Sequence, residues 1–104
     1  MISEKLRIYL DFIDIFIKST EAIKYKKNIK DLGSRLLKVG LGLMVVAPDS
    51  VVKKYTFWKL LAMEGSNMEK IVNAFGDVII EMRKDLIGET ECNVEDALDI
   101  FLKG

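Results

Sequence analysis

Polar residues in the first quarter of the chain recur every three or four positions. They are Glu4, Arg7, Asp11, Asp14, Lys18 and Glu21. Because an α-helix turns about 100° per residue, these side chains form one narrow stripe. The residues between them are almost all apolar and cover roughly 220° of the circumference. The pattern predicts a helix over residues 3–25 that is either central in the fold or buried by a second chain.

The second segment with helical spacing covers residues 28–47, and its last nine residues, VGLGLMVVA, are apolar all round. We expect these nine residues to be buried in a helix, with a buried strand as the alternative. Glycine is unfavourable inside a helix by about 1 kcal/mol relative to alanine. Gly33 and Gly40, seven residues apart near the apolar face, are therefore expected where the helix backbone closely approaches a neighbouring helix.

Proline, glycine and asparagine separate the later segments. Pro48 suits the first position of a helix and Gly65 suits the residue after one. Asn93 followed by Asp96 resembles a pair that caps the start of the last helix. The predicted helices span residues 3–25, 28–47, 48–64, 67–86 and 94–103. The sequence therefore predicts an all-α, single-domain bundle of four to five helices with short connections over residues 1–104.

Composition excludes several kinds of chemistry. The 104 residues include no histidine and one cysteine, Cys92. Without histidine the chain lacks the commonest general base and any Glu-x-x-His metal pair, and a lone cysteine holds no zinc. We therefore expect no enzyme activity, no cofactor and no metal. The single cysteine fits a reducing compartment, and no apolar run is long enough to span a membrane, so we expect a cytoplasmic protein.

The net charge of zero hides an asymmetry along the chain. Residues 1–60 hold 12 Lys and Arg and 6 Asp and Glu, a net charge of +6, and residues 61–104 hold 4 and 10, a net charge of −6. The two halves can fold against each other or pair with a second copy. Nucleic-acid binding by the basic surface of residues 24–59 is the alternative function. Its candidate anion-contacting residues are Lys24, Lys26, Lys27, Lys30, Lys53 and Lys54.

The segment EMRKDL, residues 81–86, combines two cations with carboxylates at the end of an amphipathic pattern. Cations in the last turn of a helix are favoured by its dipole, which explains Arg83 and Lys84 without a binding site. A sharper hypothesis is that Arg83, at the edge of the apolar face, forms a structural ion pair with Glu4. We therefore interpret EMRKDL as a helix ending, with a site as the lesser alternative.

Three short motifs carry a resemblance to a known group of proteins. They are Ser3-Glu4-Lys5, Asp49 with Val51-Val52, and Met82-Arg83-Lys84-Asp85-Leu86. In these motifs the chain resembles uncharacterised bacterial and phage helical proteins with a C-terminal A-x-R-K-D-L-type helix ending. It departs from them at Glu81, where a small residue is expected, and at Ile87, which separates Leu86 from Gly88. The resemblance implies a helical bundle and brings no known activity.

The broad apolar arc of the first predicted helix leads to the functional hypothesis. Ile8, Phe12 and Ile15 lie furthest from the opposite apolar side of this helix, so one side is expected to face the fold and the other a partner. We predict a non-enzymatic interaction domain that forms a homodimer or binds another helical protein, with these three residues as the candidate interface. A monomer in which this helix is simply central is the alternative.

Overall fold

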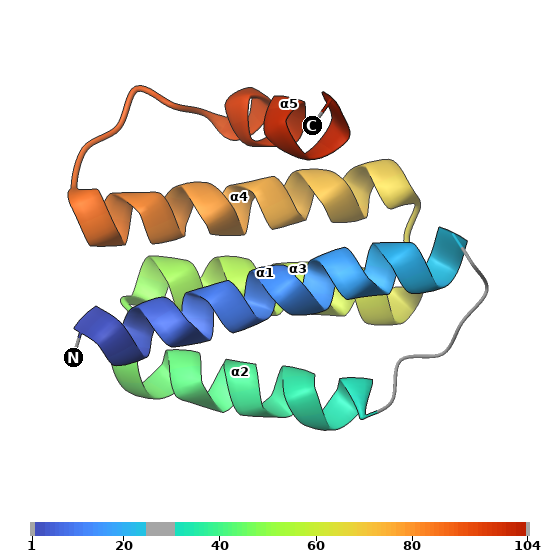
Figure 1. Cartoon of the computed structure of the whole chain (residues 1–104), viewed down its shortest axis with the longest axis horizontal. Helices are drawn as coiled ribbons and strands as arrows, with labels where there is room; N and C mark the ends of the chain where they lie inside the picture. The colour runs from blue at the N-terminus through green and yellow to red at the C-terminus, as the bar shows by residue number, and fades with distance from the viewer. Residues whose placement is uncertain (1, 25–30, 104) are drawn as a thin grey trace. The chain divides into compact units, whose positions relative to one another are not determined.

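The computed structural model describes residues 2–24 and 31–103, which form helices and no strand (Figure 1). The helices are α1 (Ile2–Lys24), α2 (Leu32–Val46), α3 (Asp49–Glu64), α4 (Met68–Ile87) and α5 (Val94–Lys103). The predicted all-α class is confirmed, and four of the predicted helices agree with the structure to within one residue at each end. The predicted start of the second helix differs: residues 28–30 lie outside the described residues, and α2 begins at Leu32.

The chain divides into two compact units, residues 1–47 with α1 and α2, and residues 48–104 with α3, α4 and α5. The charge asymmetry follows this division. Residues 1–47 hold 9 Lys and Arg against 5 Asp and Glu, a net charge of +4, and residues 48–104 hold 7 against 11, a net charge of −4. A single domain over residues 1–104 stays a prediction.

The first unit is an antiparallel pair of helices (Figure 1). Gly42 of α2 lies against Ile8 of α1, where a β-carbon would come within 2.9 Å of the Ile8 Cδ1 atom. The inner face of α2 buries Val39 and Leu43. The close approach predicted at Gly33 is wrong, because Gly33 is exposed and a β-carbon there would meet no atom within 4 Å. Gly42 takes that role instead.

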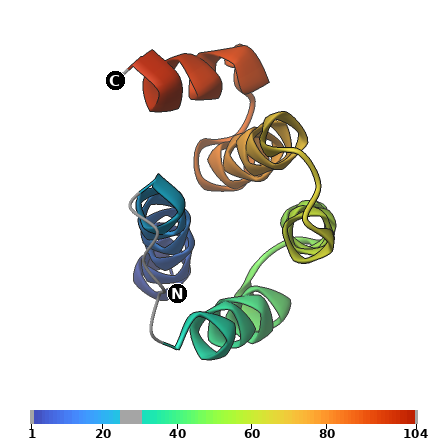
Figure 2. The same ribbon diagram turned by 90° about the vertical axis from the view of Figure 1, so that its right-hand side faces the viewer.

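In the second unit, α4 lies between α3 and α5 (Figure 2). On α3, Val51, Tyr55 and Trp58 are buried on one face, whereas Ala62, which shares their helical spacing, is exposed. Most of the apolar face of α4 is buried as well. Against α5, a β-carbon at Gly76 would lie 2.8 Å from the Val94 Cγ1 atom, so the absence of a side chain at residue 76 brings these two helices close together.

The helix ends in the second unit follow their sequence signals. Asn67 caps α4 by accepting a hydrogen bond of 2.9 Å from the Lys70 backbone N–H. Gly65 ends α3 at a φ of 72°, in the left-handed region that glycine adopts without steric cost. Pro48 departs slightly from the prediction, since it occupies the N-cap position with extended backbone and α3 begins one residue later. None of the described helices contains a stretch long and apolar enough to cross a bilayer.

Candidate functional site

The most distinctive surface of the first unit is the outer face of α2, formed by Leu37, Leu41, Met44 and Val45. Their exposed fractions are 55%, 59%, 67% and 82% in that order. Spacings of four and three residues place these side chains on one side of the helix, opposite the buried Val39 and Leu43. Lys38, which is also exposed, lies at the edge of that side next to Val45. The outer face of α2 is therefore an apolar stripe in contact with solvent.

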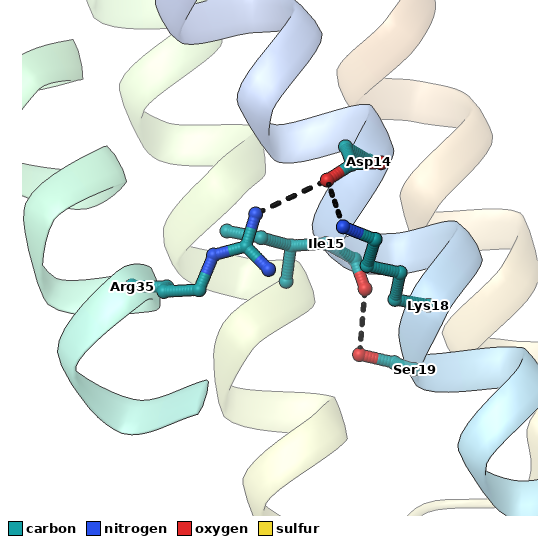
Figure 3. A network of polar contacts seen from close by, with 5 residues as sticks. All are labelled: Asp14, Ile15, Lys18, Ser19 and Arg35. Atoms are coloured by element: carbon teal, nitrogen blue, oxygen red, sulfur yellow. Dashed lines mark hydrogen bonds and ion pairs between the residues drawn. The ribbon is translucent and has the colours of Figure 1, made fainter. Parts of the chain in front are cut away.

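The orientation of α2 is fixed by a polar contact with α1 as well as by packing. Arg35 reaches from α2 and donates a hydrogen bond of 3.1 Å from Nη2 to the Asp14 Oδ2 atom (Figure 3). Lys18 Nζ, one turn further along α1, lies 3.1 Å from the same oxygen. Arg35 therefore joins α2 to α1 by a partly exposed ion pair, on a side of α2 away from the outer face.

The shared carboxylate responds electrostatically to these two cations. Hydrogen bonds from Lys18 and then from Arg35 lower the pKa of the Asp14 carboxyl below its ordinary value of 3.8. Next to it, the Ser19 hydroxyl donates a 2.8 Å hydrogen bond to the Ile15 carbonyl within α1 (Figure 3). These side chains are partly exposed to solvent. Their contacts link α1 to α2, and none of them is placed as a reactive group.

The sequence predicted a different exposure for the second half of α2. We expected all nine residues of VGLGLMVVA to be buried, but Leu41, Met44 and Val45 are exposed. An all-round apolar helix needs neighbours on every side to be buried, and in its own unit α2 packs only on α1. The signal that could have revealed the outer face was the four- and three-residue spacing of Leu37, Leu41 and Met44.

The predicted interface on α1 is wrong. Phe12 and Ile15 are 0% and 1% exposed, and Ile8 packs beside Gly42 and is only partly accessible. The accessible apolar residues of α1 lie on the opposite side, which the sequence assigned to the fold. They are Leu6, Leu10 and Ile17. The sequence predicted the broad apolar arc of α1, but it assigned the buried side to a partner and the accessible side to the fold.

A groove of about 410 Å³ lies between α1 and α2. Its charged lining consists of Glu4, Arg7, Asp11, Arg35 and Lys38, and its apolar lining consists of Ile8, Ile15, Val39 and Gly42. Both signs of charge line the groove, with three cations and two carboxylates, so it shows no strong preference for an anion or a cation. Among the described residues that line it, no serine, cysteine or threonine could serve as a nucleophile.

In the second unit, a groove of about 510 Å³ lies between α3 and α4. It is lined by Phe57, Leu61, Asn67, Glu69, Lys70, Asn73, Ala74 and Asp77. Asn67 already caps α4, and the Asn73 side chain donates to the Glu69 carbonyl at 2.8 Å. These amides therefore serve the helix itself. Across residues 2–24 and 31–103, no three acidic or cysteine side chains gather closely enough to hold a metal ion.

Arg83 has a partner within its own unit. Its Nε donates a 2.8 Å hydrogen bond to the Thr90 hydroxyl, which also accepts a 3.0 Å hydrogen bond from the Cys92 backbone N–H. Arg83 therefore ties the end of α4 to the connection that leads to α5. A pair with Glu4 would join the two units, and it stays a prediction. Lys84 lies 3.2 Å from the Glu81 carboxylate one turn earlier and is exposed, as expected for a cation in a last turn.

The basic residues proposed for nucleic-acid binding are described only in part. Lys26, Lys27, Lys30 and the Lys24 side chain lie outside the described residues. Lys53 and Lys54 are exposed on α3. Of the aromatic residues near them, Phe57 is exposed, whereas Tyr55 and Trp58 are buried and present no ring face to a base. Burial also raises the pKa of Tyr55 to about 12.

Comparison with known proteins brings no relative. No protein-family model, no curated protein and no solved structure matches the chain. The resemblance to bacterial and phage helical proteins stays a prediction.

Proposed function

We propose that this protein acts through protein–protein contact and self-associates as a homodimer through the outer face of α2. The observation that carries this proposal is the exposure of four large apolar side chains, each more than half accessible, on one helix. Together they expose an apolar area on the order of 400 Å², the size of patches that mark interaction sites on soluble proteins.

The area and the charge of this face support a second copy as the occupant. A standard interface covers roughly 800 Å² per partner, with an apolar centre and a polar rim. The outer face of α2 supplies such a centre, and Ser34 and the aliphatic part of Lys38 border it on one side. The four apolar side chains carry no charge and Lys38 lies at the edge of the face, so two copies can meet across a two-fold axis without placing like charges in the centre.

Molar mass in solution, measured by light scattering across a tenfold dilution, tests the proposal. We expect twice the chain mass of 11.8 kDa for the parent. Leu41→Glu places a charge in the centre of the face and should give the monomer mass. Leu41 is exposed and glutamate is a good helix former, so this variant should keep the parent's helicity. Its denaturant midpoint should lie below the parent's only by the stability that dimerisation adds.

Met63→Glu is the matched control. Met63 lies on α3, is 73% exposed and is far along the chain from α2, so this change should leave the dimer intact. A parent mass of 11.8 kDa at every dilution contradicts self-association. A dimer that Leu41→Glu leaves unchanged contradicts the assignment to α2.

Nucleic-acid binding through residues 24–59 is the alternative, supported by the exposed Lys53 and Lys54 beside the exposed Phe57. The dependence of binding on salt concentration distinguishes nucleic-acid binding from self-association. Phosphate contacts weaken steeply as salt rises. Pairing through the apolar face of α2 should instead depend little on salt, because the contact is apolar and the net charge of the chain is zero. We also propose a cytoplasmic location, which the single cysteine supports because it can form no disulfide within the chain.

A further inference from the structure

The outer face of α2 changes in bulk from one end to the other. At its N-terminal end are Gly33 and Ser34, both exposed, and a β-carbon at Gly33 would meet no atom within 4 Å. At its C-terminal end are Met44 and Val45, the two most exposed side chains of the face. The N-terminal end of the face therefore carries small residues with open space above them, and the C-terminal end carries large, projecting side chains.

We propose that α2 pairs with α2 of a second copy in the antiparallel direction. The large side chains at the C-terminal end of each helix then pack on the small residues at the N-terminal end of the other. This inference rests on the proposed function and adds the geometry of the dimer. Met44 of one copy then packs on Ser34 of the other, and Leu41 on Leu37. A parallel pair would instead stack Met44 on Met44 and leave the open space above Gly33 unfilled.

The spacing of the residues agrees with this arrangement. Ser34, Leu37, Leu41 and Met44 follow one another by three, four and three residues, the spacing of the two core positions of a coiled-coil heptad. Antiparallel pairing about residue 39 matches these four residues in reverse order, 34 with 44 and 37 with 41. All four residues of each copy therefore find a partner in one register.

The charges at the helix ends favour the same direction. α2 has no acidic residue in its first turn and no basic residue in its last turn, and its N-cap residue, Asp31, makes no side-chain hydrogen bond to the helix end, so the partial charges at its termini are only weakly compensated by its own side chains. An antiparallel partner places its negative C-terminal end beside the positive N-terminal end. A parallel partner would bring like ends together.

Disulfide trapping of the full chain distinguishes the two directions. In a Cys92→Ser background, Ser34→Cys and Met44→Cys are prepared as separate variants, one of them with a tag that changes its mass. A disulfide requires Cα atoms about 4.4–6.8 Å apart. In the antiparallel dimer, the two copies of residue 34 are ten residues apart along the axis, about 15 Å, and so are the two copies of residue 44.

We expect mild oxidation of the mixture to give the mixed disulfide dimer, and neither variant alone to give more than a trace. Disulfide dimers of each variant alone would overturn the antiparallel direction in favour of a parallel pair. A dimeric mass without any disulfide dimer would overturn the register. A monomeric mass in the Cys92→Ser background, with the parent also monomeric, would reject the proposed function itself and the inference with it.

Discussion

Gly42 of α2 and Ile8 of α1 meet where the two helices of the first unit approach each other closely. A β-carbon at residue 42 would lie 2.9 Å from the Ile8 Cδ1 atom and 3.4 Å from its Cγ1 atom. The second unit contains a similar approach, where a β-carbon at Gly76 would lie 2.8 Å from the Val94 Cγ1 atom. The two contacts differ in the atom that would have to move.

We predict that Gly42→Ala is tolerated and that Gly76→Ala is not. Alanine gains about 1 kcal/mol of helix propensity at both positions. Ile8 Cδ1 is the end of a flexible side chain and can rotate away, so Gly42→Ala should stay within about 1 kcal/mol of the parent. Val94 Cγ1 is attached directly to a β-branched carbon with one preferred rotamer, so Gly76→Ala should cost roughly 1–3 kcal/mol. Urea unfolding at equal protein concentration measures both, and equal midpoints for the two variants would contradict this reasoning.

The lowered pKa of Asp14 makes part of the stability dependent on pH. A carboxyl group whose pKa is lower in the folded state contributes stability above its unfolded pKa, and this contribution is lost as the pH falls through the folded value. Asp14→Asn should therefore destabilise the chain at pH 7, and the difference from the parent should shrink from pH 4 downwards. Unfolding midpoints at pH 7 and near pH 3 measure this change.

Asp11→Asn is the control for this measurement. Asp11 lies one turn earlier on α1, is exposed and makes no ion pair among the residues that the structure describes. Its loss should change the midpoint little at either pH. If both variants lose the same stability at pH 7, the contacts of Asp14 with Lys18 and Arg35 are not what stabilises the pair of helices α1 and α2.

The local signals in the sequence predicted local structure well. Asn93 with Asp96 predicted a capping pair, and the structure contains both of its hydrogen bonds. Gly65 predicted the end of α3, and the cap of α4, which the sequence left open between Ser66 and Asn67, is Asn67. Each of these signals depends on atoms within about one helical turn, so the sequence alone determines the geometry.

The candidate site could be predicted only in part, because exposure depends on residues distant in sequence. The apolar arc of α1 was evident, but the side that faces the fold was not, and Phe12 was assigned to the surface although it is buried. Likewise Leu41 and Leu43 look equivalent in the sequence, yet only Leu43 is buried. A helical pattern gives relative angles around one helix and does not place its neighbours.

Burial of Tyr55 predicts a late step in the alkaline titration of the protein. Its pKa is raised to about 12 by desolvation, so its phenol should ionise after a tyrosine at the ordinary value of 10. The unfolded chain releases that proton first, and stability should therefore fall as the pH rises between about 10 and about 12. Ultraviolet absorbance of the phenolate measures the step, which should be missing in Tyr55→Phe. A titration that is identical in the two proteins above pH 10 would contradict the burial of this ring.

The capping pair at the start of α5 gives the last prediction. The Asn93 side chain accepts a 3.1 Å hydrogen bond from the Asp96 backbone N–H, and the Asp96 carboxylate accepts one of 2.8 Å from the Asn93 backbone N–H. α5 has only 10 residues, and a helix this short depends on its cap and on packing against α4. We expect Asn93→Ala to cost about 1 kcal/mol and to speed hydrogen exchange of the α5 amides first.

Asn93→Ser is the matched variant for this prediction, because serine also accepts a hydrogen bond at an N-cap. It should restore most of the lost stability and the slow exchange of the α5 amides. Loss of protection in both variants would mean that the asparagine acts through something other than its cap. Unchanged α5 exchange in Asn93→Ala would mean that the contacts of Phe101 with Phe75, whose ring centroids lie 6.1 Å apart, are sufficient to hold the helix.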